Sequence, residues 1–403
     1  MSEQPESPGP ASAPVVLPAL DGDPVEIARG LVDVRSVSGE ETGLADAVEL
    51  ALRTYDHLEV LRHGDTVVAR TNLGLAERVI VAGHLDTVPV AVTPDQPEGN
   101  VPGRLETRDG AEVLWGRGSV DMKGGDAVIL HLAATLTAPR RDVTWVLYDH
   151  EEVEASLNGL GRALDAHPDW FTADLAVLGE PTAGDIEGGC NGTLRLILDV
   201  PGRAAHSGRA WVGANAVHAA GVLIGRAAAA PVRTVDVEGL AYREGFNVTL
   251  IEGGVAANTI PPSCRIAVNY RFAPDLPAED ALARAKRVLA GLPVDGSGDD
   301  GATDPVIDGG TGPVTVTLDD LSPAARPGLD SPLAAELIDA VRRRGGAVGP
   351  KYGWTDVARF SAAAIPAVNF GPGDALLAHT DDEHVSAQAV RDCFSALHGW
   401  LTD

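Results

Sequence analysis

RVIVAGHLDTVP, residues 78–89, is the stretch that decides the fold of this chain. Its apolar, β-branched part predicts a buried strand, which stops at Gly83 and is followed by His84 and then Asp86. An imidazole binds a cation through one ring nitrogen, and a nearby carboxylate can accept the other N–H and fix the tautomer. The stretch is therefore typical of a metal ligand at a strand end, although a lone histidine there can also be structural.

Strands and helices alternate around this stretch. The pattern predicts strands at residues 66–71, 78–82, 142–148, 175–178 and 366–370, helices at 40–51, 126–137, 158–167, 332–344 and 383–400, a helical pattern from about 23 to 62, and a loop at 95–110. Such alternation predicts an α/β domain with a mainly parallel central sheet. In these sheets, binding sites form outside the carboxyl ends of the strands.

A segment with a different order of predicted strands and helices interrupts this α/β domain. Strands are expected at 193–200, 246–251, 264–272 and 314–318, with helices at 215–229 and 278–292, which predicts a smaller inserted α+β domain. We expect a disordered tail at 1–20, a catalytic domain at 21–191 and 322–403, and the inserted domain at 192–321. The Gly/Asp-rich segment 295–312 is expected to be a mobile loop inside it.

The composition excludes several classes of protein. A net charge of −27 argues against non-specific binding to nucleic acid or anionic membranes. No apolar run approaches the roughly 20 residues that a membrane span needs, and the N-terminus has no apolar core of a signal peptide. The three cysteines, Cys190, Cys264 and Cys393, are far apart and odd in number, which fits a reducing cytoplasm and excludes a cysteine zinc site.

Histidines and carboxylates gather near the ends of the predicted elements. The candidate metal-site residues are His84, Asp86, Asp121, Glu151, Glu152, Glu180 and His379. Two histidines with several carboxylates suit two divalent ions of the zinc type, which share a bridging carboxylate. One of the adjacent glutamates can bind metal while the other transfers protons. The alternatives are a helix cap at Asp121 and a solvated helix start at the glutamate pair.

Five motifs of this chain resemble, in order, those of the di-zinc deacylase and exopeptidase family, which contains desuccinylases, deacetylases, aminoacylases and carboxypeptidases. They are HLDTVP (84–89), GRGSVDMKGG (116–125), the pair at 151–152, GEPT (179–182) and HTDDE (379–383). The resemblance covers the chain except the tail and the acidic loop. It implies two ions, zinc or cobalt, with Asp121 as the bridge, His84 and Glu180 in one site, Glu152 and His379 in the other, Asp86 orienting His84, and Glu151 as general base.

The inserted domain also carries motifs that resemble those of this family. AHSG (205–208) and ANTIP (257–261) match its lid domain, which forms the dimer in relatives. The resemblance implies a homodimer in which His206 reaches the active site of the other subunit and stabilises the oxyanion, while Asn258 contacts substrate. Asn258 can alternatively be a simple turn residue before Ile-Pro.

The resemblance also identifies residues that are expected to contact the substrate. Arg271 matches an arginine that binds a substrate carboxylate in the family, a role that suits the planar guanidinium. KYGWTDVARF (351–360) resembles a pocket-lining segment, so Thr355 and Arg359 are expected to contact substrate. Two departures are NGT at 191–193, where desuccinylases of the better-known type carry Arg-Gly-Ser, and His150, where many relatives carry Asp. The departure at 191–193 removes an expected carboxylate contact, so the motifs do not specify the acyl group of the substrate.

The sequence thus predicts a metal-dependent amide hydrolase that acts on a small N-acyl amino acid. A metal-activated water attacks the amide, and Glu151 moves its proton to the leaving amine. A non-catalytic metal-binding scaffold on the same fold is the alternative from another class. Glu151 argues against the scaffold, because a scaffold needs no base beside a metal ligand.

Overall fold

A computed structural model describes residues 15–92, 94, 97, 99–294, 305–308 and 310–403. Its contacts divide the chain into two compact units: unit 1 is Met1–Ile186, Ser331–Ala347 and Asn369–Asp403, and unit 2 is Glu187–Asp330 and Val348–Val368. The predicted inserted domain, 192–321, falls within unit 2, and its boundaries stay a prediction. Most of the expected tail and of the acidic loop, 1–14, 295–304 and 309, lies outside the described residues.

Unit 1 contains the alternating part of the chain. Its strands are β1 (Glu59–His63), β2 (Thr66–Arg70), β3 (Arg78–His84), β4 (Arg104–Arg108), β5 (Ala111–Trp115), β6 (Asp142–Tyr148), β7 (Leu175–Leu178) and β19 (His384–Ser386). Its helices are α1 (Pro24–Val32), α2 (Thr42–Leu52), α3 (Gly124–Thr135), α4 (Gly159–Ala166), α7 (Pro332–Arg342) and α9 (Ala387–Thr402), with short turns η1 (Ser119–Lys123), η2 (Pro168–Phe171) and η4 (Ala375–Leu377). Strands β8 (Ile186–Gly188) and β18 (Ala367–Asn369) lie where the chain passes between the units.

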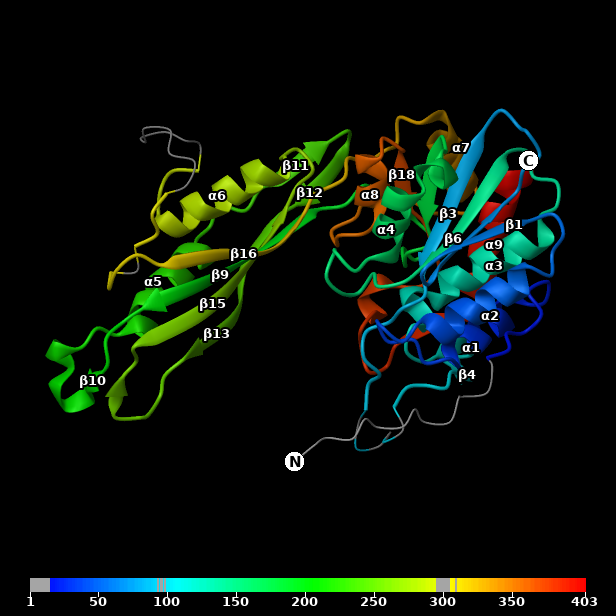
Figure 1. The fold of residues 1–403 in the computed structure, drawn as a ribbon. Helices are drawn as coiled ribbons and strands as arrows, with labels where there is room; N and C mark the ends of the chain where they lie inside the picture. Colours follow the sequence, from blue (N-terminus) through cyan, green and yellow to red (C-terminus); the bar gives the residue numbers. More distant parts are fainter. Residues whose placement is uncertain (1–14, 93, 95–96, 98, 295–304, 309) are drawn as a thin grey trace. The chain divides into compact units, whose positions relative to one another are not determined.

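The central sheet of unit 1 contains the order β1-β2-β6-β3-β7. Its strands β1, β3 and β6 are labelled in Figure 1. Strand β3 runs parallel to both β6 and β7, whereas β2 is antiparallel to β1 and β6, so the α/β fold is confirmed with a mixed sheet. His84 pairs in register with Tyr148, the last residue of β6. The two strands therefore end side by side, and the loop after β6 begins next to His84.

Burial on both faces explains why β3 is a continuous apolar run. Residues 79–82 are fully buried, as expected for a strand covered on both sides of a sheet. Helix α3 packs against β3 and β6 and also contacts α1 and α9, so it is buried nearly all round. Each such apolar side chain contributes about 1.5–3 kcal/mol to folding, which makes the strand ends a rigid base for the site.

Three predicted elements differ from the structure. Residues 59–63 form β1 instead of helix, because a two-residue turn at Gly64-Asp65 pairs them with β2. The predicted loop contains β4, which pairs with β5 through Asp109-Gly110, both with positive φ. This Asp-Gly pair is a hairpin signal that the loop prediction overlooked. The last helix begins after Ser386, whose hydroxyl accepts a hydrogen bond from the Ala389 N–H, and not at Glu383.

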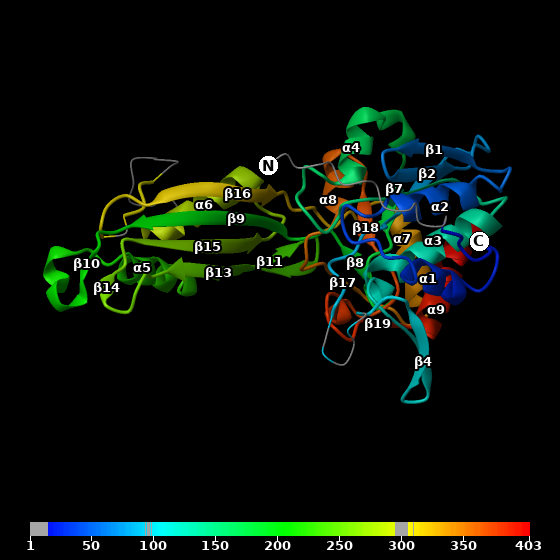
Figure 2. The same cartoon turned by 60° about the horizontal axis from the view of Figure 1, so that its bottom comes forward.

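Unit 2 is a separate α+β layer. Its strands are β9 (Gly192–Pro201), β10 (Ala205–His206), β11 (Thr234–Val237), β12 (Leu240–Arg243), β13 (Gly245–Gly253), β14 (Thr259–Ile260), β15 (Ser263–Phe272), β16 (Thr315–Ser322) and β17 (Val348–Pro350), and its helical segments are η3 (Ser207–Val212), α5 (Ala216–Ala228), α6 (Ala278–Ala290) and α8 (Val357–Ala362). Its main sheet is antiparallel in the order β13-β15-β9-β16 (Figure 2). Alternate residues of β9 and β15 bury against α5 and α6, as the period of a half-covered sheet requires.

Among the described residues, no helix combines the length and the apolar character that crossing a membrane requires.

Candidate metal centre

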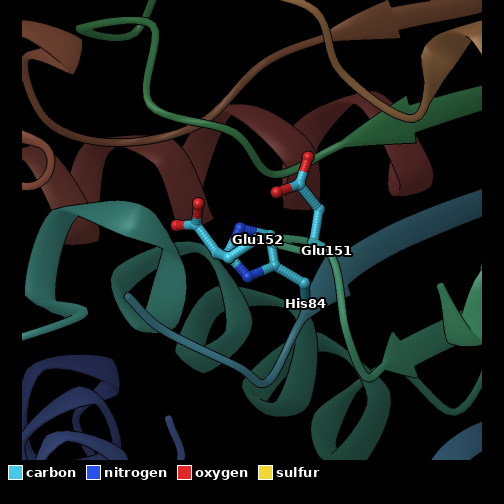
Figure 3. Close-up of side chains that lie close together, drawn as sticks. All are labelled: His84, Glu151 and Glu152. Carbon is cyan, nitrogen blue, oxygen red and sulfur yellow. The ribbon is translucent and has the colours of Figure 1, made fainter. Parts of the chain in front are cut away.

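Three neighbouring parallel strands of unit 1 present candidate ligands at their carboxyl ends. His84 closes β3, Glu151 and Glu152 follow β6, and Glu180 follows β7. The side chains of His84, Glu151 and Glu152 gather at one place (Figure 3). Asp121 joins them from η1, and His379 joins them from the loop that precedes β19.

Asp121 lies between the two histidines. Its Oδ1 is 3.2 Å from His84 Nε2, and its Oδ2 is 3.3 Å from His379 Nε2. His379 Nε2 is also 2.9 Å from Glu152 Oε1. One carboxylate oxygen thus faces each histidine, which is the arrangement expected of a bridging ligand.

The residues fit two ions in chemistry and in spacing. The ligand atoms of His84, Asp121 and Glu180 lie within 4.8 Å of one another, as do those of Asp121, Glu152 and His379. Ligands at about 2.0–2.2 Å from a tetrahedral zinc ion lie roughly 3.3–3.5 Å apart, close to the distances around Asp121. These two groups match the two ligand sets that the motifs imply. The roles of their members as ligands stay predictions.

The charges of this cluster favour cations. Burial would raise the pKa of Asp121, but hydrogen bonds with His379 and His84 bring the pKa below its ordinary value. Hydrogen bonds with Asp121 and then Glu152 raise the pKa of His379 to about 10. Burial opposes the charged form of His84, yet Asp121 and the charge of Glu151 hold its pKa well above the ordinary value. The cluster therefore stabilises positive charge on both sides of Asp121.

Asp86 has a different contact from the one predicted. Its carboxylate Oδ1 is 3.6 Å from His84 Nδ1, too far for a hydrogen bond, and the ring nitrogen is instead 3.0 Å from the backbone carbonyl of Asp86. The carboxylate accepts the N–H groups of Glu151 and Glu152 at 2.9 and 3.0 Å and the Ser38 hydroxyl at 2.7 Å. Asp86 thus contacts His84 through its backbone carbonyl and binds the backbone of Glu151 and Glu152 through its carboxylate.

Two motif residues without a predicted role, Arg117 and Glu383, form a buried pair that contacts the backbone of Asp121. Arg117 and Glu383 form a buried ion pair at 2.7 Å, and Glu383 also accepts the backbone N–H of Asp121 at 3.2 Å. The sequence places them 266 residues apart. No spacing rule could pair them, although both belong to motifs that also contain a candidate ligand.

His150, the departure noted beside the glutamate pair, lies outside the ligand groups. Its backbone has a φ of 58°, rare for a residue other than glycine. Its Nδ1 lies 2.7 Å from Asp149 Oδ2 and 3.4 Å from Glu41 Oε1. The histidine therefore anchors the start of the loop that presents Glu151 and Glu152.

The predicted substrate residues all belong to unit 2. His206 and Asn258 are exposed neighbours on β10 and just before β14, where the Ser207 N–H donates to the Asn258 carbonyl at 2.8 Å. Arg271 is half-buried on β15, and its burial lowers its pKa. Thr355 is buried before α8, and Arg359 of α8 forms an ion pair with Asp356. Their contacts with substrate stay predictions.

Comparison with known proteins places the chain in a family. A putative succinyl-diaminopimelate desuccinylase of Mycobacterium tuberculosis is 46% identical over 383 residues, 95% of this chain and 99% of the relative. A succinyl-diaminopimelate desuccinylase of Corynebacterium glutamicum is 44% identical over 393 residues, 96% of this chain and 98% of the relative. Both alignments cover units 1 and 2 nearly completely.

A solved structure shares the fold, and a family model matches the sequence. The metallo-carboxypeptidase of Sulfolobus solfataricus has a TM-score of 0.74 at 15% identity, with 94% of this chain and 98% of that chain covered. Residues 80–403 match the model of peptidase family M20/M25/M40, and this match includes every candidate ligand. The chain therefore belongs to peptidase family M20/M25/M40.

Proposed function

We propose that this protein hydrolyses N-succinyl-LL-2,6-diaminopimelate to succinate and LL-2,6-diaminopimelate, a step of lysine and diaminopimelate biosynthesis. The observation that carries the proposal is the pair of ligand groups joined by Asp121, with Glu151 beside them. The substrate is supported by the two relatives named as desuccinylases over nearly the full length of the chain. The cytoplasm is the proposed location, because the three cysteines are free and buried.

The proposed centre holds two divalent ions, zinc or cobalt. His84 and Glu180 would hold one ion, Glu152 and His379 would hold the other, and Asp121 would be shared by both groups. Such ions, when bound, supply Lewis-acid activation of water and of the scissile carbonyl. Glu151 takes the proton of the attacking water and returns a proton to the leaving amine. Asp86 holds this base in place, since its carboxylate binds the Glu151 N–H.

A homodimer completes the proposed active site. Strand β13 is an edge of its sheet, and Leu250 and Ile251 on it are 42% and 53% exposed. An open edge with exposed apolar residues favours pairing with a second copy. In that dimer, His206 of each subunit donates a hydrogen bond to the developing oxyanion in the other subunit.

Arg271 is the proposed contact for a substrate carboxylate. Among the described residues, its guanidinium forms no hydrogen bond or ion pair, and it is half-buried on β15. Asp320 is close enough for its charge to act on Arg271 but forms no hydrogen bond or ion pair with it, so the partly desolvated guanidinium is suited to a bidentate contact with a ligand carboxylate. It also supplies local positive charge in a chain of net charge −27.

A second candidate is an acetylornithine deacetylase or another N-acyl-amino-acid deacylase. The observation that favours it is Asn191, which stands where desuccinylases of the better-known type carry arginine, and whose side-chain amide donates to the Arg243 carbonyl. The segment Tyr352–Asp356 and the rest of the hinge at 188–193 favour the desuccinylase. The experiment that separates the two is a release assay with both substrates on zinc-loaded protein.

Replacing Arg271 by lysine should reduce kcat/KM for N-succinyl-LL-2,6-diaminopimelate by about 10-fold or more, because lysine keeps the charge but loses the bidentate contact. The loss for a small N-acyl amino acid without the distal carboxylate should be much smaller. The measurement is kcat/KM for both substrates in both proteins. Arg265→Lys is the matched control, since Arg265 lies on the same strand but pairs with Asp199 in solvent. Equal losses on both substrates would assign Arg271 a structural role.

Mixing two inactive variants should restore activity if His206 acts across the dimer. A His206→Ala chain retains its own Glu151, and a Glu151→Gln chain supplies an intact His206. Random exchange in a twofold dimer makes about half of the dimers mixed, each with one complete site, so about a quarter of the wild-type activity should return. A chain with both substitutions, mixed with His206→Ala, is the control and should restore none. Confirmed subunit exchange without recovery would place His206 in its own subunit's site.

A further inference from the structure

We propose that the buried ion pair of Arg117 and Glu383 is a positioning device, which fixes the distance between Asp121 and His379 and so sets the affinity of the metal site that they form with Glu152. This inference rests on the metal centre of the proposed function. It assigns a role to two residues that lie outside the ligand groups. All the residues concerned belong to unit 1.

Glu383 holds the backbone of the proposed bridging ligand. Its side chain is 1% exposed, and its Oε1 accepts the N–H groups of Val120 and Asp121 at 3.1 and 3.2 Å. A shift of Glu383 therefore moves the peptide that carries Asp121. The carboxylate also lies four residues beyond His379, so the same side chain joins the two ligand-bearing segments.

Arg117 extends this connection to further segments. Its guanidinium is 4% exposed and pairs with Glu383 Oε2 at 2.7 Å. Its Nη1 also donates to the carbonyl of Thr380 at 3.3 Å, and its Nε donates to the carbonyl of Pro89 at 3.1 Å. Thr380 follows His379 directly, and Pro89 ends the segment that begins with His84. Arg117, which lies four residues before Asp121, thus contacts the segments that bear His84 and His379.

His379 depends on these contacts for its position. Its side chain is 52% exposed, so packing does not fix it, and its backbone has a φ of 63°. By contrast, His84 is 1% exposed at the end of a buried strand. Because metal ligands must be held to within about 0.5 Å, an exposed histidine on a loop needs an anchor. The bond from Arg117 to Thr380 provides that anchor at the next residue.

Stability alone gives no reason for this ion pair. Removing two charges from water carries a desolvation penalty, and an apolar pair of the same size is often at least as stable. The additional bonds of Arg117 to two carbonyls and of Glu383 to two N–H groups are specific to these segments. The pair therefore specifies one arrangement of the loops, in the way that partners behind metal ligands orient them.

The test is the binding of Zn²⁺ alone to metal-free protein, measured by calorimetric titration. Glu383→Gln keeps the size and one acceptor but loses the charge that pairs with Arg117. We expect a loss of about 10–100-fold in affinity for one of the two ions, and a similar loss in Arg117→Lys. Asp382→Asn is the matched control, since it breaks the exposed pair with Arg108 on the same loop and should leave both affinities unchanged.

A second arm separates positioning from general damage to the fold. In a His379→Ala background, Glu383→Gln should weaken the remaining ion by clearly less than it weakens the ion of the His379 site, because only its hold on Asp121 is then left to act. Thermal unfolding of the metal-free proteins is recorded in parallel. Wild-type affinity for both ions in Glu383→Gln and Arg117→Lys, or an equal further loss in the His379→Ala background, would overturn the inference. A wild-type protein that binds no Zn²⁺ would instead contradict the metal centre itself.

Discussion

Asp121→Ala should lose both metal ions and at least about 10⁴-fold of its turnover, because metal activation and base catalysis fail together. One oxygen of Asp121 faces His84 and the other faces His379, so one substitution removes a ligand from both groups. The measurement is metal content by elemental analysis, together with the rate of amide hydrolysis. Circular dichroism checks that the variant is folded.

Asp121→Asn gives a graded comparison for this prediction. The amide keeps the shape of the side chain but has one strong acceptor oxygen instead of two. It can therefore bind one ion but is a poor bridge between two. We therefore expect about one ion per chain in Asp121→Asn and none in Asp121→Ala. Two ions per chain in Asp121→Ala would refute the bridging role and would require another carboxylate between the histidines.

Glu151→Gln should keep both ions and the fold but lose about 10²–10⁴-fold in kcat, the usual contribution of general acid–base catalysis. Glutamine preserves the size of the side chain and leaves the Glu151 N–H bound to Asp86. It cannot take a proton from water. The measurement combines kcat with metal content on the same sample.

Glu152→Gln is the matched control, because the neighbouring glutamate is assigned to metal and not to proton transfer. Its carboxylate lies 2.9 Å from His379 Nε2. We expect this variant to lose an ion, whereas Glu151→Gln keeps both. Activity of Glu151→Gln within a factor of about three of wild type would place the base elsewhere, since loss of a general base costs far more.

The strand ends of unit 1 could be predicted from sequence because burial leaves a strong signal there. An apolar run that stops at a histidine or a glutamate marks both a buried strand and a polar end, as at residues 78–84 and 175–180. Once the parallel register is known, these ends must lie together. Asp121 and His379 lie on irregular segments, so only their motifs identified them.

Contacts between distant segments could not be predicted in this way. Arg117 and Glu383 are 266 residues apart, and the separate motifs do not reveal that one side chain accepts the N–H of Asp121. Asp86 illustrates the same point at short range. Its spacing from His84 suggested a carboxylate–imidazole contact, but the turn directs the carboxylate to the N–H groups of Glu151 and Glu152.

The sequence pattern did not predict the hairpins β1–β2 and β4–β5, and the reason lies in their short length and their turns. Residues 59–63 fit a helical period as well as a strand, since a short segment gives few residues with which to tell the periods apart. The turns decide the outcome, and both Gly64-Asp65 and Asp109-Gly110 are two-residue connections between antiparallel strands.

The most direct test of the proposed function is kcat/KM for N-succinyl-LL-2,6-diaminopimelate and N-acetylornithine, measured side by side on zinc-loaded protein. The two substrates share the amide but differ in the carboxylates that Arg271 is proposed to bind. We expect the succinylated substrate to be preferred by at least about 10-fold, the value of one additional charge-assisted contact. A preference for N-acetylornithine would contradict the desuccinylase assignment, and no hydrolysis of either substrate by protein with two bound ions would contradict both candidate activities.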